Sequence, residues 1–198
     1  MGNRINFKLR LTKREMLTLR DKYVSDENEM TRECQALDAG QRIAIGEFNL
    51  SNLEPIIRWK SPRPLPLIMS NSSDEVTDAL CLAVGARTDR AAVAVLLGLR
   101  GVGIPVASAI LTAIDPKRFT IIDYRALDSL DVRRPSPTVN DYLEYLAFCR
   151  SAADEVCVEL RDLDRALWQQ SKDTNPKTAN RVATEYPVRP AKKRVPLA

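Results

Sequence analysis

Apolar residues recur every three or four positions along most of the chain, up to about residue 171, with polar residues between them. This spacing places the apolar side chains on one face of an α-helix. Phe119–Ile122 is a short apolar run of extended character, but no second strand is evident to pair with it, so we expect a buried connector. The pattern therefore predicts an all-α protein of roughly eight helices. They are expected to begin near Thr12, Asp26, Asn49, Ser72, Thr88, Ile104, Val139 and Ala152.

Capping residues and helix breakers give the expected ends of the first two helices. Thr12 is followed three positions later by Glu15, the pattern of a capping box, so the first helix should run to about Tyr23. The second helix, beginning at Asp26, is expected to stop near residue 38, where Gly40 follows closely.

Proline positions and apolar spacing indicate the boundaries further along. Pro55 fits an early helical position, where a missing N–H costs least. Ser61–Pro66 holds three prolines and is expected to form a loop. Near the C-terminal end, two helices are predicted over Val139–Arg150 and Ala152–Ser171.

Charge is distributed unevenly along the 198 residues. Residues 172–198 contain seven Lys and Arg against two acidic residues, whereas residues 1–171 contain 23 basic and 24 acidic ones. We therefore predict one helical domain over 1–171 and a basic, proline-containing, disordered tail over 172–198. Because the domain is nearly neutral, its net charge alone gives little support for nucleic-acid binding.

The types of residue present exclude several kinds of chemistry. The chain has no histidine, and its four cysteines show no metal-ligand spacing, so we expect no metal and no cofactor. Cys149 and Cys157 lie in apolar helical surroundings that suit buried thiols. The first residues lack the apolar core of a signal peptide, and no apolar run approaches the ~20 residues that span a bilayer. The predicted location is cytoplasmic, at the nucleoid in a bacterial cell, without a membrane partner.

The most informative stretch is a predicted helical hairpin over residues 90–114, with Gly101-Val102-Gly103 at its turn. Glycines allow positive φ and let the backbone approach another molecule without a Cβ in the way. The helix that begins at Ile104 would present free N-terminal N–H groups, which together with the helix dipole suit a phosphate. We expect these residues to contact DNA: Leu99, Arg100, Gly101, Val102, Gly103 and Ile104. The alternative is a packing corner between two helices that binds nothing.

Asp123 follows Gly101 by 22 positions, at the start of a segment that can form a helix. Leu99, Gly101–Gly103 and Asp123 resemble the helix-hairpin-helix–Gly/Pro-Asp superfamily of DNA glycosylases, in which a Leu-x-Gly-Val-Gly hairpin precedes an essential aspartate. The resemblance covers about Leu96 to Leu130. It implies a helix-hairpin-helix glycosylase-like fold, double-stranded DNA as partner and a catalytic role for Asp123. The alternative from the residues alone is that Asp123 caps the helix that follows.

Two departures from the family pattern limit the implied chemistry. Bifunctional members carry a lysine four residues after the first hairpin glycine, where this chain has Pro105. The iron–sulfur cysteines of some members are also missing. The resemblance therefore implies a monofunctional glycosylase that uses water, with Asp123 stabilising an oxocarbenium-like transition state or activating that water. A non-catalytic helix-hairpin-helix DNA-binding module is the alternative function.

Two further groups of residues are candidates for DNA contact. Trp59, Lys60 and Arg63 place an aromatic ring and cations at a helix end and loop, where they could stack on a base and bind phosphates. The alternative is a core tryptophan beside a solvated basic helix end. Lys117 and Arg118 lie in a loop before Asp123 and could also contact phosphate, or could be solvated.

Overall fold

The computed structural model describes residues 5–133 and 135–175, in which all regular structure is helical. The prediction of an all-α protein is confirmed for this part of the chain, although the two short helices α4 and α8 bring the number of helices there to ten. Their bounds are α1 Lys13–Val24, α2 Glu27–Ala44, α3 Leu50–Lys60, α4 Leu65–Ile68, α5 Ser73–Val84, α6 Asp89–Leu96, α7 Ile104–Ile114, α8 Tyr124–Ser129, α9 Val139–Val156 and α10 Leu160–Thr174.

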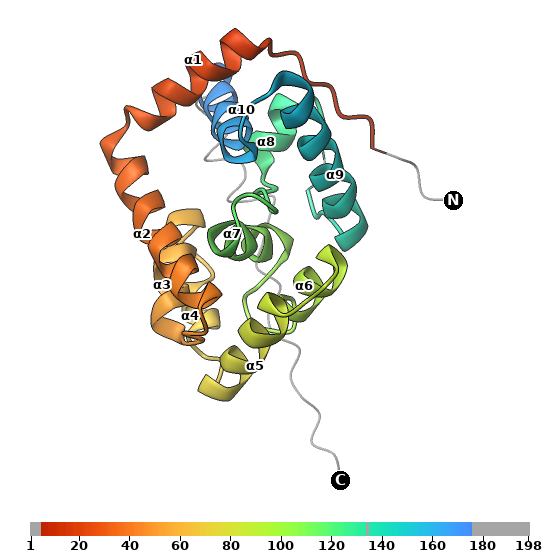
Figure 1. Cartoon of the computed structure of the whole chain (residues 1–198). Helices are drawn as coiled ribbons and strands as arrows, with labels where there is room; N and C mark the ends of the chain where they lie inside the picture. The colour runs from red at the N-terminus through yellow and green to blue at the C-terminus, as the bar shows by residue number, and fades with distance from the viewer. Residues whose placement is uncertain (1–4, 134, 176–198) are drawn as a thin grey trace.

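Helix α7 lies at the centre of the molecule, with the other helices arranged around it (Figure 1). Nine of its eleven residues are buried, in keeping with a sequence that is apolar on every face. Helices α2, α3 and α6 pack directly against it. Contact with α2 is especially close because a Cβ on Gly40 would lie 2.0 Å from the Ala113 carbonyl oxygen. A glycine at position 40 is therefore required by helix packing.

The local signals for helix starts are confirmed at several positions. Thr12 and Glu15 form the expected capping box at the start of α1. Asn49 caps α3, and Ser72 caps α5 with a second capping box. Pro55 lies in the second turn of α3, beyond the early position that we expected for it.

Several predicted boundaries are wrong. Helix α4 begins at Leu65, within the expected Ser61–Pro66 loop, and α10 begins at Leu160 rather than at Ala152. Helix α2 continues through Gly40 to Ala44, since that glycine serves the contact with α7. Helix α9 continues past residue 151 and ends at Cys157, which adopts a left-handed φ of 53°. Cys149 is buried as expected, whereas Cys157 is exposed.

The segment between α7 and α8 is a buried connector, as the sequence indicated. Two buried tyrosines hold it in place: the Tyr142 hydroxyl donates to the Thr120 carbonyl (3.1 Å) and the Tyr145 hydroxyl to the Ile121 carbonyl (3.0 Å). The Ser108 hydroxyl of α7 accepts a hydrogen bond from the Ile122 N–H at 3.2 Å. These contacts fix the backbone immediately before Asp123.

The C-terminal boundary of the domain falls slightly later than predicted. Helix α10 continues through Lys172 to Thr174, so the first residues of the expected tail are helical. The rest of that tail, residues 176–198, lies outside the described residues. Within the described ranges, every helix is too short or too polar to cross a membrane.

Candidate functional site

The two glycines of the hairpin turn have different roles. Gly101 adopts a left-handed φ of 81°, and a Cβ there would lie 2.9 Å from Leu67 Cβ and 3.1 Å from the Pro64 carbonyl oxygen. Gly101 therefore packs against the α4 region. Gly103 has an ordinary extended backbone, is exposed, and its Cβ would meet nothing closer than Pro105 Cδ at 3.9 Å. Of the two, Gly103 is the one whose backbone another molecule can approach.

Buried Asn71, which the sequence analysis did not identify, stabilises the hairpin turn. Asn71 is 6% exposed; its side-chain oxygen accepts from the Arg100 N–H at 2.8 Å, and its amide donates to the Arg100 carbonyl at 3.2 Å. This pair of bonds resembles the pairing of two backbone strands. It fixes the hairpin turn independently of the two helices that it joins.

The backbone of the turn, rather than most of its side chains, is available to a ligand. Leu99, Val102 and Ile104 are all buried, so their side chains do not reach an approaching molecule. The N–H groups of Gly103 and Ile104 donate to no acceptor within the described part of the chain. Arg100 is exposed at the same turn. The turn can therefore offer two N–H groups and one guanidinium.

Asp123 is a buried carboxylate with two internal partners. Its Oδ1 accepts from the Ala126 N–H at 2.9 Å, which makes it the N-cap of α8, and its Oδ2 lies 2.7 Å from the Lys60 ammonium. The side chains of Asp123 and Lys60 are 12% and 13% exposed. Burial raises the pKa of Asp123, but the Lys60 charge and the Ala126 N–H outweigh it, so the pKa is lowered. Asp123 is therefore ionised at neutral pH.

One short segment joins Asp123 to the hairpin turn. Lys60 is paired with Asp123, and four residues later the Pro64 carbonyl packs against Gly101. The second link is Ser108, which lies one turn into α7 and binds the residue before Asp123. Four residues of helix span about 6 Å, so Asp123 lies close to the end of α7 that the hairpin turn occupies. Arg63 is exposed within the joining segment.

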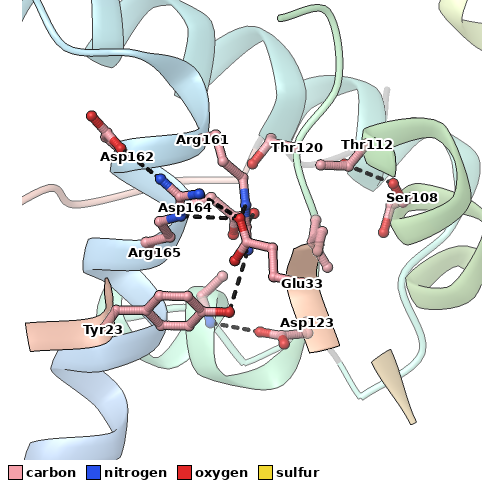
Figure 2. A network of polar contacts seen from close by, with 12 residues as sticks. Tyr23, Glu33, Ser108, Thr112, Thr120, Asp123, Arg161, Asp162, Asp164 and Arg165 are labelled. Carbon is pink, nitrogen blue, oxygen red and sulfur yellow. Dashed lines mark hydrogen bonds and ion pairs between the residues drawn. The ribbon is translucent and has the colours of Figure 1, made fainter. Parts of the chain in front are cut away.

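An ionic network that no local sequence pattern predicted lies near Asp123 (Figure 2). Glu33 of α2 is completely buried and accepts from Arg161 (2.7 Å) and Arg165 (2.6 Å) of α10. Arg161 also pairs with Asp164, which is 4% exposed. Burial, together with the negative charges of Asp123 and Glu33, raises the pKa of Asp164 to about 6 although Arg161 opposes the change.

Trp59 is packed mainly as a core residue, and its contact with DNA stays a prediction. It is half-buried, with the Arg161 guanidinium 4.9 Å from its ring centroid, so it packs on the buried network. It also lines a surface hollow between α2 and α3. The other lining residues of that hollow are Arg32, Gln35, Ser51, Glu54, Pro55 and Arg58.

Lys117 and Arg118 lie at the other end of α7 and are not brought together with the hairpin turn. Arg118 is paired with Asp89 at 2.9 Å, and its carbonyl accepts from Arg150 at 3.0 Å. Lys117 is exposed beside it. Since α7 has eleven residues, these cations are separated from the turn by roughly 16 Å along the helix. Arg118 is thus a structural residue that ties α6 to α9.

Neither a metal-binding cluster in the described residues nor a known relative adds a further group to the site. The described residues contain no cluster of three or more His, Cys, Asp or Glu side chains that could hold a metal ion. Comparison of the chain with protein-family models, with curated proteins and with solved structures gives no match. The helix-hairpin-helix resemblance therefore stays a prediction.

Proposed function

We propose that the chain is a helix-hairpin-helix DNA-binding protein that acts as a monofunctional DNA glycosylase. The observation that carries the proposal is the segment of residues 60–64, which contacts Asp123 at one end and the Gly101 turn at the other. Two N–H groups without acceptors in the described residues, together with an ionised carboxylate, thus lie at the same end of α7. The motif resemblance supports the same pairing of a hairpin with an aspartate.

In this proposal the hairpin turn binds the DNA backbone. The free N–H groups of Gly103 and Ile104 donate to one phosphate, which the positive end of the α7 dipole also attracts. Arg100 and Arg63 are exposed and can pair with neighbouring phosphates. Such contacts fix position on the duplex without reading its sequence.

The proposed role of Asp123 is to stabilise positive charge on the sugar. As the bond between C1′ and the base nitrogen breaks, its electron pair leaves with the base and C1′ becomes oxocarbenium-like. Water then adds to C1′, and its proton is released. A carboxylate with a lowered pKa is ionised and suits electrostatic stabilisation, but it is a weak proton acceptor. The geometry therefore favours charge stabilisation by Asp123 over deprotonation of the water.

A single-turnover assay of base release tests the catalytic proposal. Duplexes carrying a panel of damaged or modified bases are incubated with the protein and then heated in alkali, which cuts at abasic sites. We expect strand breaks only after alkali, and none with Asp123→Asn, whose DNA affinity should be retained. The matched control is Asp128→Asn, an exposed aspartate of the same helix, which should release the base as the wild type does.

A non-catalytic DNA-binding module is the second candidate, and one observation favours it. Both oxygens of Asp123 already have partners, Ala126 and Lys60, which is the arrangement expected of a purely structural N-cap. Under this alternative no duplex of the panel loses a base, whereas DNA affinity stays measurable. That result would end the glycosylase proposal and leave the binding proposal standing.

The binding proposal has its own test at Gly103. The position is open and has an ordinary backbone, so Gly103→Val should leave the protein folded but obstruct the approach of a phosphate. We expect DNA affinity to fall about tenfold, the loss of one charge-assisted contact. Gly85→Ala, at the end of α5, is the control and should bind like the wild type. Unchanged affinity of a folded Gly103→Val protein would refute hairpin binding.

A further inference from the structure

Arg125, in the first turn of α8, is a buried cation with no hydrogen-bond or ion-pair partner in the described part of the chain. The residue is 7% exposed, and its Nη1 atom is fully buried without an acceptor. Within the described residues, the other buried side-chain atom without a partner is Gln170 Oε1, an uncharged amide. An unpaired buried charge costs far more free energy than an unpaired amide.

The arginines of the ionic clusters are all paired with carboxylates. Arg161 and Arg165 share Glu33, and Arg118 and Arg150 share Asp89. The side chains of these four arginines are 11% to 35% exposed. Arg125 differs from them in making no ion pair within the described residues, although its charge contributes, after that of Lys60, to the lowered pKa of Asp123. Since burial of a cation without a directly bonded anion is unfavourable, its position is not explained by the stability of the protein alone.

Within the described part of the chain, no neighbouring group accepts a hydrogen bond from Arg125. Its guanidinium carbon lies 5.1 Å from the Tyr124 ring centroid and 5.3 Å from that of Trp168. These aromatic rings favour a cation but accept no in-plane hydrogen bond. The nearby carboxylates are occupied, Asp123 by Lys60 and Ala126, and Asp128 by Ser171 and Asn175.

The surroundings are also suited to attract an anion. Asp123, two positions before Arg125, is paired with Lys60. Arg63 is exposed in the loop that follows Lys60. Tyr124 and Trp168 are both half-buried, so the guanidinium lies one side chain below the surface. A guanidinium that stacks on aromatic rings makes no in-plane hydrogen bond to them, so its N–H groups remain unpaired, and their planar arrangement matches the oxygens of a phosphate.

We propose that Arg125 binds a phosphate group of a ligand, and that Tyr124 and Trp168 hold the guanidinium ready for it. The phosphate can belong to a mononucleotide or to a polynucleotide chain. The proposal does not require base release or the hairpin contact, so it can hold or fail independently of them. It makes Arg125 a residue that is retained for binding at the expense of stability.

Thermal unfolding of three variants separates a binding role from a structural one. Arg125→Met keeps the length and apolar contacts of the side chain and removes the unpaired charge, so the ligand-free variant should melt at or above the wild-type temperature. Arg165→Met is the matched control, and it should melt well below the wild type because it removes a partner of buried Glu33. Arg125→Lys should fold but bind phosphate more weakly, because it loses the planar fork.

The ligand arm measures binding of inorganic phosphate, a 5′-mononucleotide and a short DNA duplex to each folded variant. We expect at least one of these probes to bind the wild type, and Arg125→Met to lose affinity about tenfold or more. Dependence on Arg125 with the small probes assigns the site to a free phosphate ester, and dependence with DNA alone assigns it to a polynucleotide. Three results would overturn the proposal: Arg125→Met melting as far below the wild type as Arg165→Met, equal binding of every probe by Arg125→Met and wild type, or binding of none of the probes by the wild type.

Discussion

The two ends of the α6–α7 hairpin are built in opposite ways. At the end where α6 begins and α7 finishes, Asp89 pairs with Arg118 and Arg150, and Gly40 brings α2 into backbone contact with Ala113. We call this the closed end. At the end occupied by the Gly101–Gly103 turn, the backbone has free N–H groups, and Arg100 and Arg63 are exposed. We call this the open end.

The difference between the two ends shows which polar groups of the described residues still lack partners and can bind a ligand. At the closed end, Arg118 and Arg150 are already paired with Asp89, so they contribute to stability. The open end has an unpaired buried guanidinium at Arg125 and a lone buried ion pair, Lys60–Asp123. Groups left without partners in a folded protein are expected at functional sites, where stability is given up for binding. The candidate site therefore belongs to the open end.

The largest effect on stability is expected from adding a methyl group at the closed end. In Gly40→Ala the new Cβ would lie 2.0 Å from the Ala113 carbonyl oxygen, so α2 and α7 must separate. We expect a loss of at least about 3 kcal/mol, the upper part of the usual range for overpacking. Chemical denaturation measures it. Gly103→Ala at the open end is the matched variant, and it should change the free energy of unfolding by less than about 1 kcal/mol. Equal losses would remove the contrast between the ends.

The next effect concerns the carboxylate of the closed end. Asp89→Ala leaves Arg118 and Arg150 without their shared partner, and both are about two-thirds buried. We expect a loss of about 2 kcal/mol, in line with hydrogen bonds to charged groups, and no change in DNA affinity. Urea unfolding and a DNA titration check the two parts. Reduced DNA affinity in the folded variant would show that the closed end takes part in binding.

An effect of similar size concerns the pH dependence of stability in the ionic network near Asp123. Asp164 has its pKa raised from 3.8 to about 6, so between these values the folded protein holds a proton that the unfolded chain releases. Its contribution to stability is therefore present below pH 4 and is lost as the pH rises to 6. The pKa of Glu33 is lowered to about 2 because Arg161 and Arg165 outweigh its burial. The contribution of Glu33 to stability is therefore lost as the pH falls below 4.5.

Asp164→Asn should remove the loss of stability that we expect as the pH rises from 4 to 6. Between pH 4 and pH 7 we expect the wild type to lose about 2 kcal/mol more than the variant, after allowance for the coupling of the buried charges. The measurement is urea unfolding at several pH values. Parallel stability curves for the two proteins would show that the pKa of Asp164 is the same in the folded and unfolded protein.

Features that depend on a few neighbouring residues could be predicted from the sequence. The Thr12–Glu15 capping box, the start of α5 at Ser72 and the helical class of the chain are all confirmed. The predicted end of α2 was wrong because the local sequence around Gly40 is typical of a helix break. The actual role of Gly40 depends on Ala113, which is far away along the chain.

The candidate site was predicted in part for the same physical reason. The hairpin turn and Asp123 have short-range patterns, and the structure places them at one end of α7. The partners that define their chemistry come from distant segments: Lys60 on Asp123 and Asn71 on Arg100. The local sequence around Glu33 is typical of an exposed acidic residue on a helix. Its burial depends on two arginine partners that lie on α10. Nothing in local spacing identifies such long-range pairs.

The most direct test of the account compares one charge reversal at each end of the hairpin. Arg63→Glu changes an exposed cation of the open end, and Lys117→Glu changes an exposed cation beside the closed end. Both proteins should keep the wild-type stability to within about 0.5 kcal/mol. Affinity for a DNA duplex is measured by fluorescence anisotropy at several salt concentrations. We predict that Arg63→Glu weakens binding about tenfold or more and flattens its salt dependence, while Lys117→Glu binds nearly as the wild type does. Equal losses in the two variants, or a greater loss in Lys117→Glu, would contradict the assignment of DNA binding to the open end.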